Sequence, residues 1–445
     1  MSEFLQHYES VHPTTWVYLS SWLILGLFFK FNRLWSVRNI DLLGLIALGP
    51  GLLLVESGRA RNIESDVVVG FIWLFCVGGF FLIRMLIDPG MVRRPLLEAN
   101  VTSGGLTFLG AALLVFLMAN VLTSDSPRPV GEVVEVDQPR PSAEFPDGQL
   151  AIHGPGYPPL RRLPDIATQR FEEPADPPTA TDVLIRTAKI LAMISQLAIV
   201  IGLILIGLYH FDNVKTGIAA ATLYLIIPYT AMMTGRVDHA LPAALLVWAV
   251  VCYRRPLAAG VLIGVAAGAM YYPIFLLPLW CGFYWRKGLL RFGVGVLAAL
   301  AVMVGCLAFS AEGGQDFFAQ LRQMFGFIAP WNDVLNTHLQ GFWAFDFIIP
   351  VYRLPVLAGF LAISFGLAIW PAQKNLGTLM SCSAAVMLGC QFWHAHDGGL
   401  QVAWYLPLML AAILRPNLED RIALNVLREP WLPKRLIRAA KRRAA

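Results

Sequence analysis

Two short polar stretches interrupt the apolar runs of this chain and carry residue types that can move protons or bind phosphate. The first contains Arg236, Asp238 and His239, and the second runs from Trp393 to Asp397. A carboxylate can accept the proton of a hydroxyl group. Arginine binds phosphate oxygens through charge-assisted hydrogen bonds. We therefore predict that Asp238 is a catalytic base or metal ligand, with Arg236 as a phosphate partner and His239 beside the substrate.

The second stretch, WHAHD, concentrates two histidines and an acid in five residues. We predict that His394 and His396 contact phosphate or ligate metal, with Trp393 and Asp397 lining the same substrate site. The spacing suits a divalent metal ion, but it defines no third ligand. A metal cofactor is therefore possible without being required.

Ordinary structural roles compete with each of these predictions. Asp238 could cap the helix expected at 239–253, and Arg236 could reach lipid headgroups. The second stretch could be a hydrated loop that turns at Gly398 and Gly399.

A third polar group precedes another apolar run. Asp333 and His338 are predicted to bind substrate there, in a stretch that also contains Asn332 and Asn336. The alternative is that these residues shape a loop around Pro330 and Trp331.

The composition places these residues in a membrane protein. Of the 445 residues, 57% are hydrophobic and only 14% are charged, far less charge than in a soluble protein. Many apolar runs approach the length that crosses a bilayer. We predict an all-α, polytopic transmembrane helical bundle of about thirteen spans: 15–29, 41–56, 67–87, 104–123, 184–209, 217–233, 239–253, 257–270, 273–285, 291–309, 356–371, 377–392 and 399–415.

The distribution of basic residues predicts the orientation. Alternate connections between spans are basic, and the C-terminal tail 415–445 carries nine Lys or Arg residues. By the positive-inside rule, the N-terminus lies outside the cytoplasmic (inner) membrane and the C-terminus lies in the cytoplasm. The tail then lies against membrane lipid, and we expect no nucleic-acid partner.

Composition also divides the chain. Residues 124–182 hold twelve of the 29 prolines, which argues against a packed domain and predicts a long, acidic, Pro-rich external loop. It separates a four-span unit, 1–123, from a multi-span core, 183–415, which a basic tail, 416–445, follows. We also expect an interfacial helix at 315–326.

The segment GAMYYPIFLLP, Gly268 to Pro278, predicts a broken hairpin. Basic residues at 254–255 and 286–287 leave 30 residues for two spans, so each is too short for a full crossing. The glycines at 260, 264 and 268 give one helix a face without side chains, suited to close packing. The turn is either a structural hairpin or the floor of an outward-facing cavity lined by Tyr271 and Tyr272.

Four segments together resemble the GT-C integral-membrane glycosyltransferases, notably bacterial members that use polyprenyl-phosphate sugars, often as mannosyltransferases. The segments are RRPLAAGVLIGVAAGAMYYPIFLLPLWCGFYWRKG, MTGRVDHALPAALLVWAV, NTHLQGFW and FWHAHDGGLQVAWYLPLML. They cover roughly 184–415. The resemblance implies a GT-C-like core and a transferase that moves a sugar, with mannose as one option, from a polyprenyl-phosphate donor on the outer face.

The chain departs from that family pattern in two places. Met270 stands where a lysine is frequent, and the usual Asp-aromatic motif of the first external loop has no clear copy. The segment GYPPLRRLPD echoes part of that loop, which makes Asp165 the second catalytic candidate. These departures keep open a non-catalytic membrane scaffold of the same fold, and a transporter or flippase for a lipid-linked substrate is a further alternative.

Overall fold

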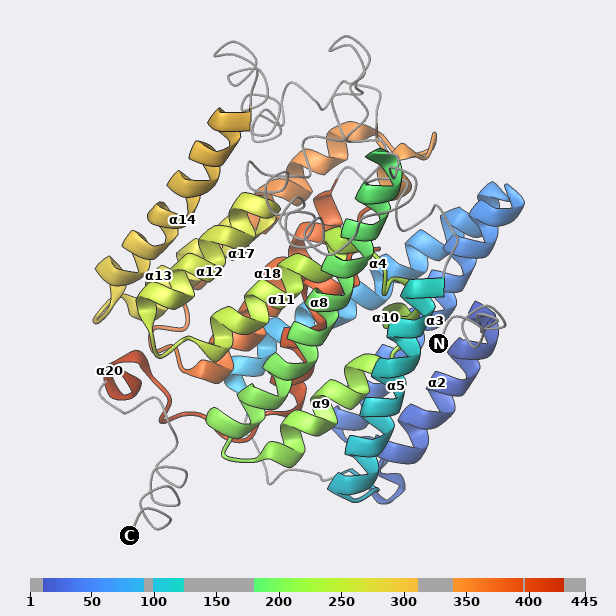
Figure 1. Cartoon of the computed structure of the whole chain (residues 1–445), viewed down its shortest axis with the longest axis horizontal. Coiled ribbons are helices and arrows are strands. Elements are labelled where there is room, and N and C mark those ends of the chain that lie inside the picture. Colours follow the sequence, from blue (N-terminus) through green and yellow to red (C-terminus); the bar gives the residue numbers. More distant parts are fainter. Residues whose placement is uncertain (1–10, 92–98, 124–179, 311–338, 395–396, 428–445) are drawn as a thin grey trace, which may run out of the picture.

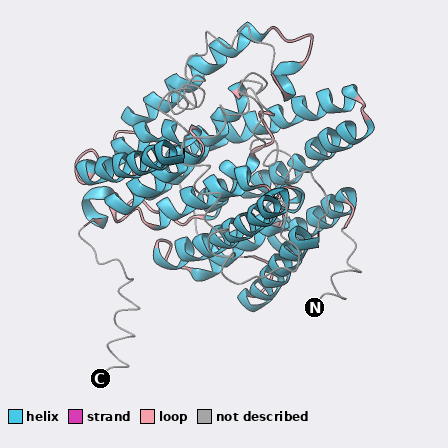
Figure 2. Ribbon diagram, turned by 45° about the horizontal axis from the view of Figure 1, so that its top comes forward, coloured by secondary structure: helices cyan, strands magenta, loops and turns pink. Residues whose placement is uncertain are grey.

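The computed structural model describes residues 11–91, 99–123, 180–310, 339–394 and 397–427. Throughout these residues the chain folds into α-helices and short 3-10 helices, and no strand forms in this part of the chain (Figures 1 and 2). The longer helices are α2 (Pro13–Phe28), α3 (Val37–Arg61), α4 (Glu64–Ile87), α5 (Ser103–Thr123), α8 (Ala180–Tyr209), α9 (Val214–Ile226), α11 (Val237–Val251), α12 (Pro256–Ala269), α13 (Leu277–Tyr284), α14 (Leu289–Ser310), α17 (Arg353–Ile369), α18 (Leu376–Trp393) and α19 (Leu406–Leu414).

Each of the thirteen predicted spans overlaps a helix. Six helices in the described part are both long and apolar enough to cross a membrane: α3, α4, α5, α8, α14 and α18. The prediction of an all-α polytopic membrane protein is therefore confirmed. The other helices are shorter, so the total number of crossings stays a prediction.

Proline changes the boundaries of two predicted spans. The span expected at 217–233 is broken at Ile227, where α9 ends and the short α10 (Pro228–Met232) begins with its proline. The last span begins later than expected, because η6 (Val402–Trp404) precedes α19, whose second residue is Pro407. Proline lacks an N–H group and suits the first turn of a helix better than its interior.

The broken hairpin is present. Helix α12 ends at Ala269, η3 (Tyr272–Leu276) makes the turn, and α13 continues. Close packing on the glycine face is confirmed, with α14 as the neighbour. A Cβ atom on Gly260 would lie 2.2 Å from the Phe292 carbonyl oxygen, and one on Gly264 would lie 2.8 Å from the Val296 carbonyl oxygen.

The N-terminal helices pack directly on the rest of the bundle, on the right in Figure 1. Helix α4 packs on α18, and α5 packs on α9, where the Thr222 hydroxyl donates to the Leu106 carbonyl at 3.2 Å. The proposed domain boundaries stay predictions. The ranges 124–179 and 428–445, and the interfacial helix expected at 315–326, lie outside the described residues.

Buried charges join the N-terminal helices to the C-terminal part of the bundle. Arg84 of α4 donates to both carboxylate oxygens of Asp41, at 2.9 and 3.1 Å, and to Asp88 at 2.9 Å. Arg415, just after α19, donates to the other oxygen of Asp88 at 2.7 Å. All four side chains are buried. We call these four residues the buried ion cluster.

Candidate functional site

The first polar stretch forms a compact charged group at the start of α11. Arg236 occupies the N-cap position, and its guanidinium donates from Nε and Nη2 to the two oxygens of Asp238, at 3.2 and 2.8 Å. Asp238 is the second residue of the helix, so the alternative that it occupies the N-cap position is wrong.

His239 is held against this ion pair by a tyrosine. The Tyr229 hydroxyl of α10 lies 2.6 Å from His239 Nδ1, and the two rings are stacked. The other ring nitrogen, Nε2, lies 3.4 Å from Asp238 Oδ2. Both rings are buried. Tyr229 therefore fixes the imidazole orientation, a role that the sequence did not reveal.

Trp404 connects the two polar stretches. Its indole Nε1 donates to the Asp238 carbonyl oxygen at 2.9 Å. Its ring stacks on His394, with centroids 5.8 Å apart, and the Tyr272 ring lies against both at 5.1 and 4.8 Å. Segments separated by more than 150 residues in sequence therefore meet around one aromatic cluster at the same end of the bundle.

The two hairpin tyrosines lie in the protein interior. Tyr271 is 3% exposed and Tyr272 is fully buried, with their ring centroids 4.4 Å apart. Trp393 packs on Tyr272 at 5.5 Å. This enclosure favours the structural interpretation of the hairpin, and a substrate contact for the two tyrosines stays a prediction.

Arg353 positions the C-terminal end of α18. Its Nε and Nη2 donate to the Trp393 carbonyl at 3.3 and 3.0 Å, and its side chain is buried. A cation at a helix C-terminus is favoured by the helix dipole. The sequence analysis missed this residue, although a charged residue just before the apolar run 356–371 was a usable signal.

Asp397 pairs with a residue from the N-terminal helices. Its carboxylate accepts a hydrogen bond from Arg59, in the last turn of α3, whose guanidinium also lies 5.6 Å from the centre of the Phe71 ring. The two side chains are 43% and 19% exposed. Asp397 adopts the left-handed conformation (φ 53°), and its N–H donates to the Gln340 carbonyl. The sequence suggested no site role for Arg59.

Four predicted site residues lie outside the described residues: Asp165, Asp333, His338 and His396. Within the described residues, no group of three or more His, Cys, Asp or Glu side chains could hold a metal ion. Divalent metal binding therefore stays a prediction that involves His396.

The geometry thus gathers an ion pair, two histidines and several aromatic rings from the short helices of the core. Residues 178–392 match the model of glycosyltransferase family 87. The match agrees with the GT-C-type resemblance of the motifs and supports glycosyltransferase activity in a membrane protein. Neither the curated proteins nor the solved structures contain a match to the chain.

The family 87 match covers just under half of the chain and ends near the end of α18. It includes the Arg236 group and the hairpin. It does not include Trp404, Asp397 or the helices α2 to α5. The N-terminal helices therefore supply Arg59 from outside the region that matches family 87.

Proposed function

We propose that this chain transfers a sugar, with mannose as one option, from a polyprenyl-phosphate donor to an acceptor on the outer face of the cytoplasmic membrane. The observation that carries the proposal is the contact between the two polar stretches: Trp404 binds the backbone of Asp238 while its ring stacks on His394. The family 87 match supports the reaction class. The outer face follows from the basic connections on the opposite side.

A lipid-carried donor fits the location. Nucleotide sugars are cytoplasmic compounds, so a transferase on the outer face needs a donor that the membrane delivers. The sugar–phosphate bond of such a donor lies near the headgroups, and the short helices α11, α12 and α13 are compatible with a site at that depth. The donor and membrane lipid are the partners of this proposal.

The proposed reaction needs one base and at least one cation. The acceptor oxygen attacks C1 of the sugar, the bond from C1 to the phosphate oxygen breaks, and polyprenyl phosphate leaves. The acceptor proton passes to the Asp238 carboxylate. Arg236 donates to this carboxylate at 2.8 Å and can stabilise the phosphate that leaves.

A non-catalytic scaffold of the same fold is the competing function. Two observations favour it: Arg236 already occupies both oxygens of Asp238, and both hairpin tyrosines are buried. A scaffold needs the contacts around Trp404 but does not need the Asp238 carboxylate to accept a proton.

Replacing Asp238 by asparagine separates the two functions. The amide keeps the shape but cannot act as the base, so we expect sugar transfer to fall about 100-fold or more while the lipid donor still binds. Transfer is measured in proteoliposomes supplied with a panel of polyprenyl-phosphate hexoses. Unchanged transfer in Asp238→Asn would rule out this base.

Asp212→Asn is the matched control. Asp212 lies between α8 and α9, at the other end of the bundle, where its exposed carboxylate pairs with Arg421 at 3.1 Å. The substitution replaces one carboxylate by an amide, as Asp238→Asn does, but at a residue outside the candidate site. If both variants lose transfer equally, the loss reflects general damage rather than catalysis.

A further inference from the structure

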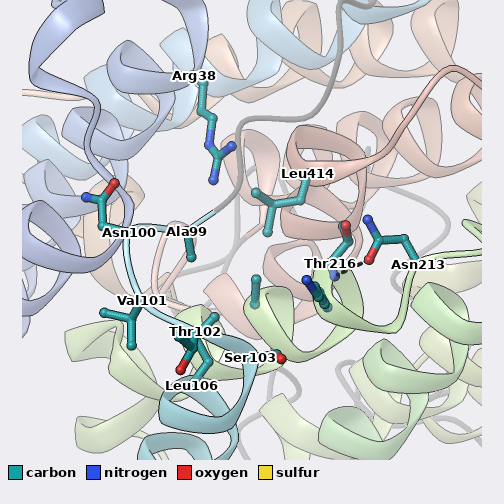
Figure 3. Close-up of a pocket in the computed structure, with 12 residues that line it drawn as sticks. Arg38, Ala99, Asn100, Val101, Thr102, Ser103, Leu106, Asn213, Thr216 and Leu414 are labelled. Carbon is teal, nitrogen blue, oxygen red and sulfur yellow. Dashed lines mark hydrogen bonds between the residues drawn. The ribbon is translucent and has the colours of Figure 1, made fainter.

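A polar cavity lies at the end of the bundle opposite the candidate site. It has a volume of about 370 Å³ and is enclosed by the beginnings of α3, α5 and α9 and the end of α19 (Figure 3). Its polar lining comprises Arg38, Asn100, Thr102, Ser103, Asn213, Lys215 and Thr216. A pocket of this size holds a small molecule or a lipid headgroup.

The cavity is distinct from the proposed catalytic site. Helix α3 reaches both, with Arg38 in its first turn and Arg59 in its last. Their separation of 21 positions corresponds to about 30 Å of helix at 1.5 Å per residue. A ligand of one site therefore does not touch the other.

The charge of the cavity wall is positive. Arg38 and Lys215 come from different helices, and Figure 3 shows the Arg38 guanidinium pointing into the space between Asn100 and Leu414. A third cation, Lys30, does not line the cavity but contacts a lining residue, since its Nζ donates to Asn100 Oδ1 at 2.7 Å. No carboxylate is among the described residues that line the cavity.

Two described acids at this end of the bundle are paired with arginines. Leu414 lines the cavity, and the next residue, Arg415, belongs to the buried ion cluster. In that cluster Asp41 and Asp88 each accept hydrogen bonds from an arginine. The cluster therefore adds as many positive as negative charges and does not offset the charge of the cavity wall.

Two helix beginnings add to the field at the cavity. The N-terminal ends of α5 and α9 both face it, and such ends carry partial positive charge. Thr102 Oγ1 and Asn213 Oδ1 already accept from backbone N–H groups of these helices, at 3.3 and 3.4 Å. The helix ends therefore contribute less to anion binding than the Arg38 and Lys215 side chains do.

We propose that this cavity binds a phosphate group, taken either from an anionic lipid headgroup or from a soluble phosphate compound. Basic pockets between membrane helices, on the side where basic loops gather, bind lipid headgroups. The bound group would bridge α3 and α5 to α9, which lies in the region that matches family 87, and to α19, which follows that region. This inference does not depend on the proposed sugar transfer.

Native mass spectrometry of the full chain in detergent tests the proposal. Three probes are compared: dioctanoyl phosphatidylglycerol, dioctanoyl phosphatidylcholine and inorganic phosphate. We expect one phosphatidylglycerol to be retained by the native protein. The double variant Arg38→Gln/Lys215→Gln should bind it about 30-fold more weakly. Each cation contributes about 1 kcal/mol, which is less than a tenfold loss of affinity, and the two losses multiply.

Arg286→Gln is the matched control, because Arg286 is an exposed arginine in another basic connection and does not line the cavity. Lys215 is exposed, so Lys215→Gln alone keeps the test valid if the double variant does not fold. Retention of inorganic phosphate but not lipid would assign the site to a soluble phosphate compound. Equal retention by native and variant proteins, equal loss in Arg286→Gln, or equal retention of phosphatidylcholine would overturn the proposal.

Discussion

The two ends of the bundle use ionisable residues in opposite ways. In the buried ion cluster, two arginines and two aspartates bind one another with every side chain nearly excluded from solvent. At the candidate site, Arg236 and Asp238 are 21% and 13% exposed, and Arg59 and Asp397 are 43% and 19% exposed. Closed networks of this kind stabilise a fold, whereas partly exposed charges remain able to exchange partners with a ligand. Mutations in the buried ion cluster should therefore change mainly stability, and mutations at the candidate site should change mainly activity.

The largest effect is expected in the closed network. Arg84→Leu removes the bidentate arginine from Asp41 and one arginine hydrogen bond from Asp88. Loss of one partner from a buried charge group costs about 3–5 kcal/mol of unfolding free energy. Unfolding in mixed micelles by titration with sodium dodecyl sulfate measures it, and Arg421→Leu, which removes the exposed pair with Asp212, should cost about 1 kcal/mol or less. Equal costs for the two variants would show that burial does not distinguish the two pairs.

The hairpin that supports the site should also be sensitive to packing. Gly260→Ala places a methyl group 2.2 Å from the Phe292 carbonyl oxygen, so α12 and α14 must separate. We expect a loss of about 2 kcal/mol in unfolding free energy. Gly293, in α14, has no atom within 4 Å of an added Cβ, so Gly293→Ala is the matched control and should stabilise by up to about 1 kcal/mol through helix propensity.

A neutral Gly260→Ala would contradict the tight contact between α12 and α14. The same unfolding titration measures both variants. Because Tyr271 and Tyr272 follow α12 directly, a displaced hairpin should also lower sugar transfer, and Gly293→Ala should leave it unchanged.

The sequence predicted the elements better than it predicted the contacts. Apolar run length and the basic connections were sufficient to predict a helix at every expected span, and the glycines at 260, 264 and 268 predicted a tight helix contact. The partner α14 was not predicted, because a small-residue face does not specify its neighbour. The break at Pro228 was missed, since the apolar run continues through it.

Sequence patterns likewise predicted some residues of the candidate site but not the contacts between helices that complete it. Residue type and position beside an apolar run identified Arg236, Asp238 and His394. Arg59, Tyr229 and Arg353 were missed, because their roles depend on which helices lie next to each other. Arg59 illustrates this limit: it pairs with an aspartate 338 positions away in the chain, and no local pattern relates the two.

Acid should destabilise the end of the bundle that contains the buried ion cluster. His210, which follows α8, is buried with Nε2 2.9 Å from the Val251 carbonyl, and burial, reinforced by the nearby Arg254, lowers the pKa of His210 to about 3. A histidine in the unfolded chain has a pKa near 6.5. Between that pH and the folded pKa of about 3, the unfolded chain therefore binds a proton at His210 and the folded chain does not. Stability is therefore complete above pH 6.5 and is lost as the pH falls, by about 1.4 kcal/mol per unit.

His210→Gln should remove this dependence, because glutamine can donate to the same carbonyl and does not titrate. Thermal unfolding midpoints at pH 7 and pH 5 measure it, and the variant should show the smaller difference. The exposed His12 provides the control, since His12→Gln should keep the acid sensitivity of the native protein. If the unfolding midpoints of all three proteins change equally with pH, His210 is not the source of the acid sensitivity.

The smallest effect on stability is expected at the pair between Arg59 and Asp397. Arg59→Gln breaks an ion pair whose arginine is 43% exposed, so unfolding free energy should fall by less than about 1 kcal/mol. Sugar transfer should fall further, by about tenfold, if the guanidinium exchanges Asp397 for the donor phosphate. Arg61→Gln, at the exposed end of the same helix, is the control for net charge and should change neither quantity. A loss of stability without a loss of transfer would place the pair with the structural contacts, and the difference between the two ends of the bundle would then be one of burial alone.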